Sequence, residues 1–490
     1  MFMNVIHRSI FFSAIERYGS LLFFVVSTAF LSRLLTPEEF GIYAVINALT
    51  AVIAASFQEF GGANYLIQKP SLSEQNIRTA FTIILCMSVL LAVTLFALRD
   101  AIAWFFSQEG LRVGLTVSAL NFFLSPFSLT LSALLRRDMA FGMLARCNLA
   151  GNFITAVISI ALAVLHYSFM APVLGTIVGN AAIVAMLVRY RRDLRIFRLS
   201  FAGYREVIHF GAYSSSVVVI NVLYNLGPQL ILGRTLGFAA VGLYNRATNV
   251  TQVFDRVVLQ VISPVVMPAI FAHTRAGGDL RQVYLSAIEL IAVVHWPFLI
   301  FLALVAEPVV WLWLGSTWIE IVPLIRVLCI ASLSLFAASL TYPVLVAVGR
   351  VRDTFISSLI SLPPSLLVIF VASFFGLQVV AVSALLTLPF QAVVAMYFVS
   401  RRLAISPMDL IRATIKSGIV TGCSTAGILG GVVISELAGA GPVSELVLPG
   451  VSAVVGWWGG VVITKHPLLA QIRLAARGMA LVAPRFPFLG

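Results

Sequence analysis

Polar side chains that suit a charged, sugar-bearing molecule recur at helical spacing in one segment near the middle of the chain. Asn245, Asn249, Gln252 and Arg256 are four, three and four residues apart, which places them on one face of a helix. Arg246 lies close to that face. Arginine matches phosphate with forked hydrogen bonds, and amide side chains suit sugar hydroxyls. The spacing therefore predicts a hydrophilic cavity for a phosphate-bearing substrate.

Other polar residues inside apolar segments extend this candidate site. The further substrate-binding candidates are Arg17, Asn221, Asn225 and Arg326. Three ionisable residues are candidates for coupling transport to protons: Glu16, Glu289 and His295. The alternative for each is structural, because side-chain hydrogen bonds between membrane helices are common and intramembrane carboxylates also pair with arginine.

The composition shows what kind of elements must position these side chains. Of 490 residues, 60% are hydrophobic and only 10% are charged, against about 25% charged in ordinary soluble domains. The mean hydropathy of +1.02 agrees. So much apolar surface requires lipid as the main solvent, which excludes a cytosolic enzyme, a secreted disulfide scaffold and a disordered chain. The first apolar run is too long for a signal peptide and predicts a retained membrane helix.

Fourteen segments are long and apolar enough to cross a bilayer, which predicts an all-α polytopic membrane protein. They are 10–33, 40–58, 79–98, 113–135, 147–165, 169–189, 208–232, 239–262, 283–306, 320–346, 354–374, 377–400, 412–434 and 446–464.

Arginine and lysine are far more frequent in the loops after even-numbered spans and in the two termini than in the loops after odd-numbered spans. The positive-inside rule therefore places both termini in the cytoplasm. This distribution also explains the net charge of +13 without nucleic-acid binding, because proteins that bind nucleic acid gather their basic residues into one patch.

The tryptophans of the 307–319 segment, Trp311, Trp313 and Trp318, are expected at the outer membrane interface. The tail after residue 465 predicts either an interfacial helix or a plain tail.

An internal repeat is the strongest long-range pattern. LSRLLTPEEFGIY, beginning at Leu31, and LGRTLGFAAVGLY, beginning at Leu232, share five identities at an offset of 201 residues. AIVAMLVRYRR from Ala182 and AVVAMYFVSRR from Ala392 match at an offset of 210. The repeat predicts two parallel six-helix lobes, residues 1–200 and 203–405, around a central cavity. Two additional helices in 406–464 and a tail over 465–490 follow. Substrate sites of such transporters lie between the halves.

Motifs of catalysis are absent from the sequence: it has no GxSxG, no HExxH and no Walker loop. The four cysteines and six histidines show no zinc spacing. We therefore expect neither an enzyme nor a cofactor or metal.

LSRLLTPEEFGIYAV, residues 31–45, resembles the N-terminal signature of the polysaccharide-transporter family, the Wzx-like oligosaccharide flippases of the multidrug/oligosaccharidyl-lipid/polysaccharide exporter superfamily. Residues 57–81 resemble the family's second signature, and residues 233–247 and 314–328 also resemble the family. The resemblance implies two six-helix bundles forming a V. It also implies the flipping of undecaprenyl-diphosphate-linked sugar units across a bacterial inner membrane for exopolysaccharide, capsule or lipopolysaccharide O-antigen synthesis. The two additional helices depart from the commoner count of twelve.

The predicted function is therefore a flippase that works by alternating access. Its expected partners are the lipid-linked oligosaccharide, membrane lipids, and a polysaccharide polymerase with its assembly proteins. One alternative is a drug or cation exporter of the same superfamily, although an arginine-rich interior disfavours cationic substrates. Another is a membrane-embedded polymerase or transferase, although the outer loops are too short for a catalytic domain.

Overall fold

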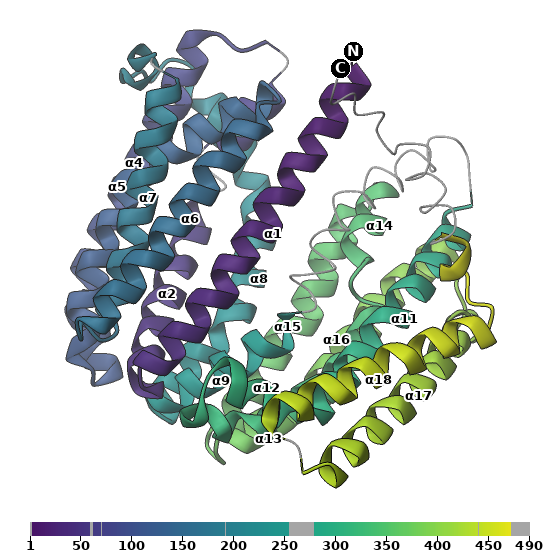
Figure 1. The fold of residues 1–490 in the computed structure, drawn as a ribbon. Helices are drawn as coiled ribbons and strands as arrows, with labels where there is room; N and C mark the ends of the chain where they lie inside the picture. The colour runs from purple at the N-terminus through teal and green to yellow at the C-terminus, as the bar shows by residue number, and fades with distance from the viewer. Residues whose placement is uncertain are drawn as a thin grey trace, which may run out of the picture. The chain divides into compact units, whose positions relative to one another are not determined.

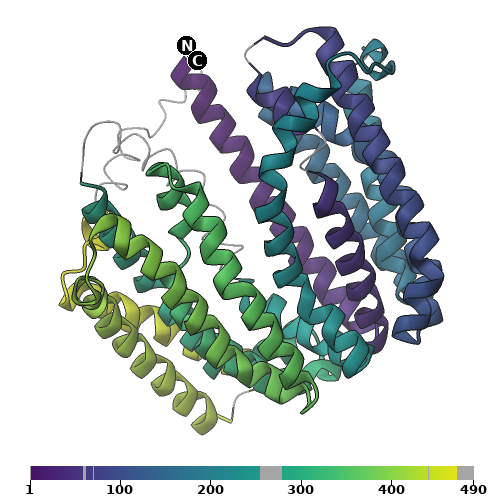
Figure 2. The same ribbon diagram turned by 180° about the vertical axis from the view of Figure 1, so that it is seen from behind.

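The computed structural model describes residues 2–58, 62–69, 71–191, 193–253, 279–439 and 441–471, and these contain helices and no β-strand (Figures 1 and 2). The elements before residue 253 are α1 (Phe2–Leu34), α2 (Pro37–Gln58), α3 (Ala63–Gln68), α4 (Glu74–Phe106), α5 (Glu109–Arg137), α6 (Phe141–Val164), α7 (Met170–Tyr190), the 3-10 helix η2 (Leu194–Phe197), α8 (Tyr204–Thr235) and α9 (Phe238–Thr251). Those after residue 279 are α11 (Leu280–Leu304), α12 (Ala306–Trp313), η4 (Ser316–Ile321), α13 (Val322–Ser332), η5 (Leu333–Phe336), α14 (Thr341–Ala347), α15 (Val351–Ser373), α16 (Leu377–Leu403), α17 (Pro407–Leu437) and α18 (Pro442–Ile463).

Membrane-spanning segments dominate this fold. In the described residues, twelve segments are helical, long and apolar enough to cross a membrane. They coincide with twelve of the fourteen predicted spans, and the prediction of an all-α polytopic membrane protein is confirmed. The seventh predicted span lies within α8. The eighth coincides at its start with α9, and its residues 254–262 lie outside the described ranges.

The tenth predicted span, 320–346, is a series of short helices: η4, α13, η5 and α14. Two buried or half-buried aromatic residues of α11 supply hydrogen bonds where the regular helix is interrupted. Trp296 Nε1 donates to the carbonyl of Leu333 at 3.0 Å, and Tyr284 Oη donates to that of Ala337, also at 3.0 Å. Such partners allow an interrupted helix within a membrane, because they satisfy backbone groups that lipid cannot.

The helices pack as two compact units. The first unit comprises Met1–Ile262, Trp313–Leu324 and Ser358–Ser383. Within it α4, α5, α6 and α7 pack as neighbouring helices, and α1 lies against α6 (Figure 1). One core cluster of this unit joins α2, α4, α5, α8 and α9 through side chains such as Val45, Leu95, Leu115, Leu232 and Val241.

The second unit comprises Ser263–Leu312, Ile325–Ser357 and Ala384–Gly490. Here the two additional helices, α17 and α18, lie side by side, and α17 packs along α11 (Figure 1). A Cβ atom on Gly456 of α18 would lie 2.4 Å from the carbonyl oxygen of Cys423, so the two helices approach at their backbones. In the tail, Leu468 and Leu469 pack on the cluster of Val293, Val420 and Val461, while residues 472–490 lie outside the described ranges.

Candidate functional site

The candidate site of the first unit lies where α2 crosses α9. Thr36 begins α2 with a capping box: its backbone N–H donates to Glu39 Oε2 at 2.8 Å, and Glu39 N–H donates to Thr36 Oγ1 at 3.3 Å. Gly237, with φ of 84°, precedes α9 in a conformation that favours glycine. These caps fix where each helix begins and therefore which residues meet at the crossing.

A reciprocal glycine contact holds the two helices together. A Cβ atom on Gly41 would lie 1.8 Å from the carbonyl oxygen of Phe238, and one on Gly242 would lie 2.0 Å from that of Pro37. Pro37 and Phe238 are themselves 201 residues apart, as are Gly41 and Gly242. Equivalent positions of the predicted repeat therefore meet reciprocally at this crossing.

Arg246 of α9 lies in an aromatic enclosure at this crossing. The residue is 2% exposed, and its Cζ atom lies 3.6 Å from the ring centre of Phe40 and 5.4 Å from that of Trp318. The two rings meet edge to face at 6.0 Å. The Arg246 Nε and Nη2 atoms have no hydrogen-bond partner among the described residues. The rings stabilise the cation through its face, and the edge of the guanidinium keeps donors that match an anionic oxygen.

Trp318 is a structural part of this enclosure. Its side chain is fully buried on η4, and its Nε1 atom donates to the carbonyl of Ser32 at 2.6 Å. Trp313 Nε1 similarly donates to the carbonyl of Val25 at 2.9 Å. The expectation of an interfacial belt is therefore wrong for Trp318, because this indole packs inside the protein, whereas Trp311 is 47% exposed.

The amides predicted beside Arg246 form hydrogen bonds along their own helices. Asn249 Nδ2 donates to Asn245 at its backbone oxygen (2.8 Å) and at Oδ1 (2.7 Å). Gln252 is exposed and ends α9. On α8, the exposed Asn225 donates to the backbone oxygen of Asn221 at 2.8 Å.

The remaining arginine candidates do not belong to the enclosure of Arg246 as the described residues form it. Arg256 lies outside the described residues, whereas Arg17 of α1 and Arg326 of α13 are exposed. The contact of the α9 residues with substrate stays a prediction.

Glu16, one of the coupling candidates, belongs to a polar contact between α1 and α6. Asn148 Nδ2 donates to Glu16 Oε1 at 2.6 Å, and one turn further Asn152 Nδ2 donates to Ser20 Oγ at 2.8 Å. This arrangement matches the structural alternative, in which polar side chains hold two membrane helices together.

The other two coupling candidates lie on α11 in the second unit. His295 is buried, with 4% of its surface exposed. Glu289 is half-buried and lies near His466, whose Nε2 atom is 3.7 Å from Glu289 Oε1. Sequence reasoning did not single out His466. Glu289 and His466 are 177 residues apart in the sequence, so no local pattern links them. The packing of the residues after α18 against α11 brings the two side chains together.

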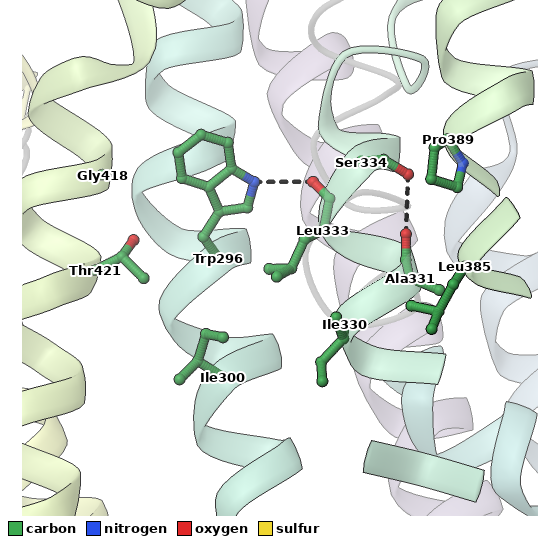
Figure 3. Close-up of a pocket in the computed structure, with 10 residues that line it drawn as sticks. All are labelled: Trp296, Ile300, Ile330, Ala331, Leu333, Ser334, Leu385, Pro389, Gly418 and Thr421. Atoms are coloured by element: carbon green, nitrogen blue, oxygen red, sulfur yellow. Dashed lines mark hydrogen bonds between the residues drawn. The ribbon is translucent and has the colours of Figure 1, made fainter. Parts of the chain in front are cut away.

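An apolar pocket of about 580 Å³ also lies in the second unit (Figure 3). Trp296 and Ile300 of α11 line one part of it, and Leu385 and Pro389 of α16 line another. The two hydroxyl groups of the lining have backbone partners, since Ser334 donates to Ala331 at 2.9 Å and Thr421 to Ser417 at 2.8 Å. The pocket therefore suits hydrocarbon better than sugar.

A protein family described as "Polysaccharide biosynthesis protein" matches residues 30–323, which is more than half of the chain. The chain belongs to this family. The matched range includes α2, α9 and Trp318, and so the whole aromatic enclosure of Arg246. The predicted resemblance to the polysaccharide-transporter family is confirmed.

Proteins similar to this chain come from several bacteria. The chain is 25% identical over 340 residues to the lipopolysaccharide biosynthesis protein WzxC of Escherichia coli (strain K12), a match covering 68% of each chain. It is 24% identical over 329 residues to the teichuronic acid biosynthesis protein TuaB of Bacillus subtilis (strain 168), covering 66% of this chain and 68% of that one. It is 23% identical over 348 residues to the succinoglycan biosynthesis transport protein ExoT of Rhizobium meliloti (strain 1021), covering 71% and 70%.

Solved structures of transporters share the fold. The lipid II flippase MurJ, in an inward closed conformation, matches with a TM-score of 0.75 over 94% of this chain and 100% of that one, at 11% identity. An inward-facing multidrug resistance MATE transporter of the MOP superfamily matches with a TM-score of 0.66 over 80% and 98%, at 14% identity. The chain is therefore a multi-pass membrane protein with the fold of that superfamily.

Proposed function

We propose that the protein is a flippase that moves undecaprenyl-diphosphate-linked oligosaccharide units from the inner to the outer leaflet of a bacterial inner membrane. These units feed the synthesis of exopolysaccharide, capsule or lipopolysaccharide O-antigen. The observation that carries the proposal is the similarity, over about two thirds of the chain, to relatives named for lipopolysaccharide biosynthesis and succinoglycan transport. Both termini lie in the cytoplasm, and a polysaccharide polymerase uses the translocated units.

The need for a protein follows from the chemistry of such a substrate. A sugar diphosphate carries charges and hydroxyl groups, and burying them in hydrocarbon without partners costs many kcal/mol. An alternating-access carrier lowers this barrier by offering polar partners in the membrane. The process breaks no covalent bond, so the protein acts as a transporter and not as an enzyme.

Arg246 is the residue we propose to attract the diphosphate. Its buried cation has aromatic neighbours and donor nitrogens without acceptors in the described part of the chain. An anionic oxygen would supply the missing acceptor, with a hydrogen bond of the strong, charge-assisted kind. Asn245 and Asn249 on the same helix would add hydrogen bonds to sugar hydroxyls.

A cation exporter of the same superfamily is the alternative that Arg246 argues against. Such a transporter needs a buried carboxylate that is available to its substrate. Glu289 is only half-buried, and the buried Asp353 already has Arg402 Nε 2.6 Å from its Oδ2. The charge of this acid is thus compensated within the protein.

A genetic experiment tests the proposal in cells. Deletion of the gene in its native host should abolish the surface polysaccharide and accumulate lipid-linked units on the cytoplasmic leaflet, and the wild-type gene should restore both. Normal surface polysaccharide in a deletion strain that has no other flippase would contradict the proposal.

A further inference from the structure

A hydrogen-bonded network joins α11 to α17 and to the segment after α18. Ser417 Oγ donates to the backbone oxygen of Glu289 at 3.0 Å and lies 3.2 Å from His466 Nε2. His466 is 1% exposed and Ser417 is fully buried. The network thus connects the additional helices to α11 near the Glu289 carboxylate.

The backbone fixes the protonation pattern of the imidazole. The Leu468 N–H donates to His466 Nδ1 at 3.2 Å, so Nδ1 acts as an acceptor and the ring hydrogen belongs on Nε2. Nε2–H then donates to Ser417 Oγ, whose own hydrogen is directed to Glu289. Burial, with a smaller contribution from the charge of Lys416, lowers the pKa of His466 from 6.5 to about 4. The imidazole is therefore neutral near neutral pH.

The Glu289 carboxylate is the member of this group that a proton can reach. Its Oε1 atom lies 3.7 Å from His466 Nε2, and 17% of its side chain is exposed, against 0% for that of His466. Lys416 of α17 is the cation whose charge acts on both groups, and Lys465, next to His466, is exposed. On α11 itself, Arg281 pairs with Asp409 at 2.7 Å.

We propose that Glu289 is a reversible proton-binding site, positioned by Ser417 and His466, at the junction of α11 with the two additional helices. A hydronium ion transfers its proton to a carboxylate oxygen of Glu289 and leaves as water. The carboxylate becomes a neutral acid, and its attraction for Lys416 is lost. Proton binding thereby changes the electrostatic contact between α11 and α17. A proton-binding site at this junction goes beyond the proposed flippase activity.

Infrared difference spectroscopy of the purified full-length protein tests the site directly. Spectra recorded between mildly alkaline and mildly acidic buffer report carboxyl groups that gain a proton. Glu289→Gln should remove one carbonyl band of a protonated carboxyl group. Glu445→Gln, which changes an exposed carboxylate in the first turn of α18, serves as the matched control and should leave that band in place. An unchanged spectrum in Glu289→Gln would overturn the proposal.

Three further variants separate proton binding from a purely structural role. Ser417→Ala and His466→Gln should keep the band but shift the pH at which it appears, because both alter the surroundings of Glu289. Lys416→Gln should also keep the band, whereas a Glu289 that serves only as an ion-pair partner predicts no band in any of these proteins. If Glu289→Gln fails to fold, an unshifted midpoint in both Ser417→Ala and His466→Gln overturns the proposal. No substrate is needed, so the outcome is independent of the flippase proposal.

Discussion

Gly41 of α2 and Gly242 of α9 hold equivalent positions in the two halves of the sequence, and each lies close to the backbone at the start of the other's helix. Gly41 faces the carbonyl of Phe238, and Gly242 faces that of Pro37. The two helices that carry these glycines also carry Phe40 and Arg246. A close backbone approach between the repeated elements thus lies on the same two helices as the buried arginine and its aromatic neighbour.

Alanine at either glycine should disturb this crossing. A methyl group would lie within 2.0 Å of a carbonyl oxygen at both positions, so the helices would have to separate. We expect Gly41→Ala and Gly242→Ala each to destabilise the protein by about 1–3 kcal/mol, as overpacking does. Thermal unfolding in detergent measures this. Gly422→Ala on α17, where a Cβ atom meets nothing within 4 Å, is the control and should not destabilise the protein, because alanine favours a helix more than glycine does.

Removal of the Arg246 side-chain charge should impair transport more than stability. A hydrogen bond to a charged group is worth about 1.5–3 kcal/mol, so Arg246→Ala should lower transport about tenfold to a hundredfold. The readout is surface polysaccharide in a deletion strain, with membrane insertion verified in parallel. Arg112→Ala, which changes a half-exposed arginine paired with Asp100, should transport normally. Full activity of Arg246→Ala would contradict a cationic substrate site.

The contact between α1 and α6 should prove structural. Glu16→Gln keeps a side-chain oxygen that can accept a hydrogen bond from Asn148. The transport rate should therefore stay within about twofold of wild type, which is less than the roughly tenfold change that a loss of about 1.4 kcal/mol would cause. Asn148→Ala should instead cost about 0.6–2 kcal/mol of stability, the range for hydrogen bonds between membrane helices. Complete loss of transport in a folded Glu16→Gln protein would instead assign Glu16 to coupling.

The pH dependence of stability should reveal the buried neutral imidazole of His466. Its pKa is lowered from 6.5 to about 4, so the unfolded chain binds this proton at higher pH than the folded protein does. Stability is therefore lost as the pH falls from 6.5 towards 4, and this contribution is constant above that window. His466→Gln should show a smaller loss over the same range in thermal unfolding. Superimposable pH profiles of the two proteins would contradict the neutral, buried state.

The membrane spans were predictable because each depends on about twenty local apolar residues. Gly41 and Gly242 were visible in the sequence as aligned repeat positions, although their mutual backbone contact was not. The break in the tenth span was hidden, since its stabilising donors, Trp296 and Tyr284, come from another helix. Hydropathy cannot report such contacts.

For the polar residues too, the sequence predicted contacts between near neighbours and missed contacts between residues far apart in the chain. The spacing of Asn245 and Asn249 correctly placed both on one helix face, where they bond to each other. The enclosure of Arg246 depends on Trp318, more than seventy residues away, and the Glu289 network depends on His466 at the far end of the chain. Distant partners of this kind arise from tertiary packing, which periodicity does not encode.

Translocation by the purified protein tests the central claim most directly. Proteoliposomes containing undecaprenyl-diphosphate-linked oligosaccharide in both leaflets are exposed to a membrane-impermeant reagent that modifies sugars. With the protein present, the modified fraction should rise beyond the outer-leaflet share towards completion, and with Arg246→Ala it should rise much more slowly. A modified fraction that stays at the level of protein-free liposomes, with the wild-type protein folded and inserted, would contradict the flippase proposal.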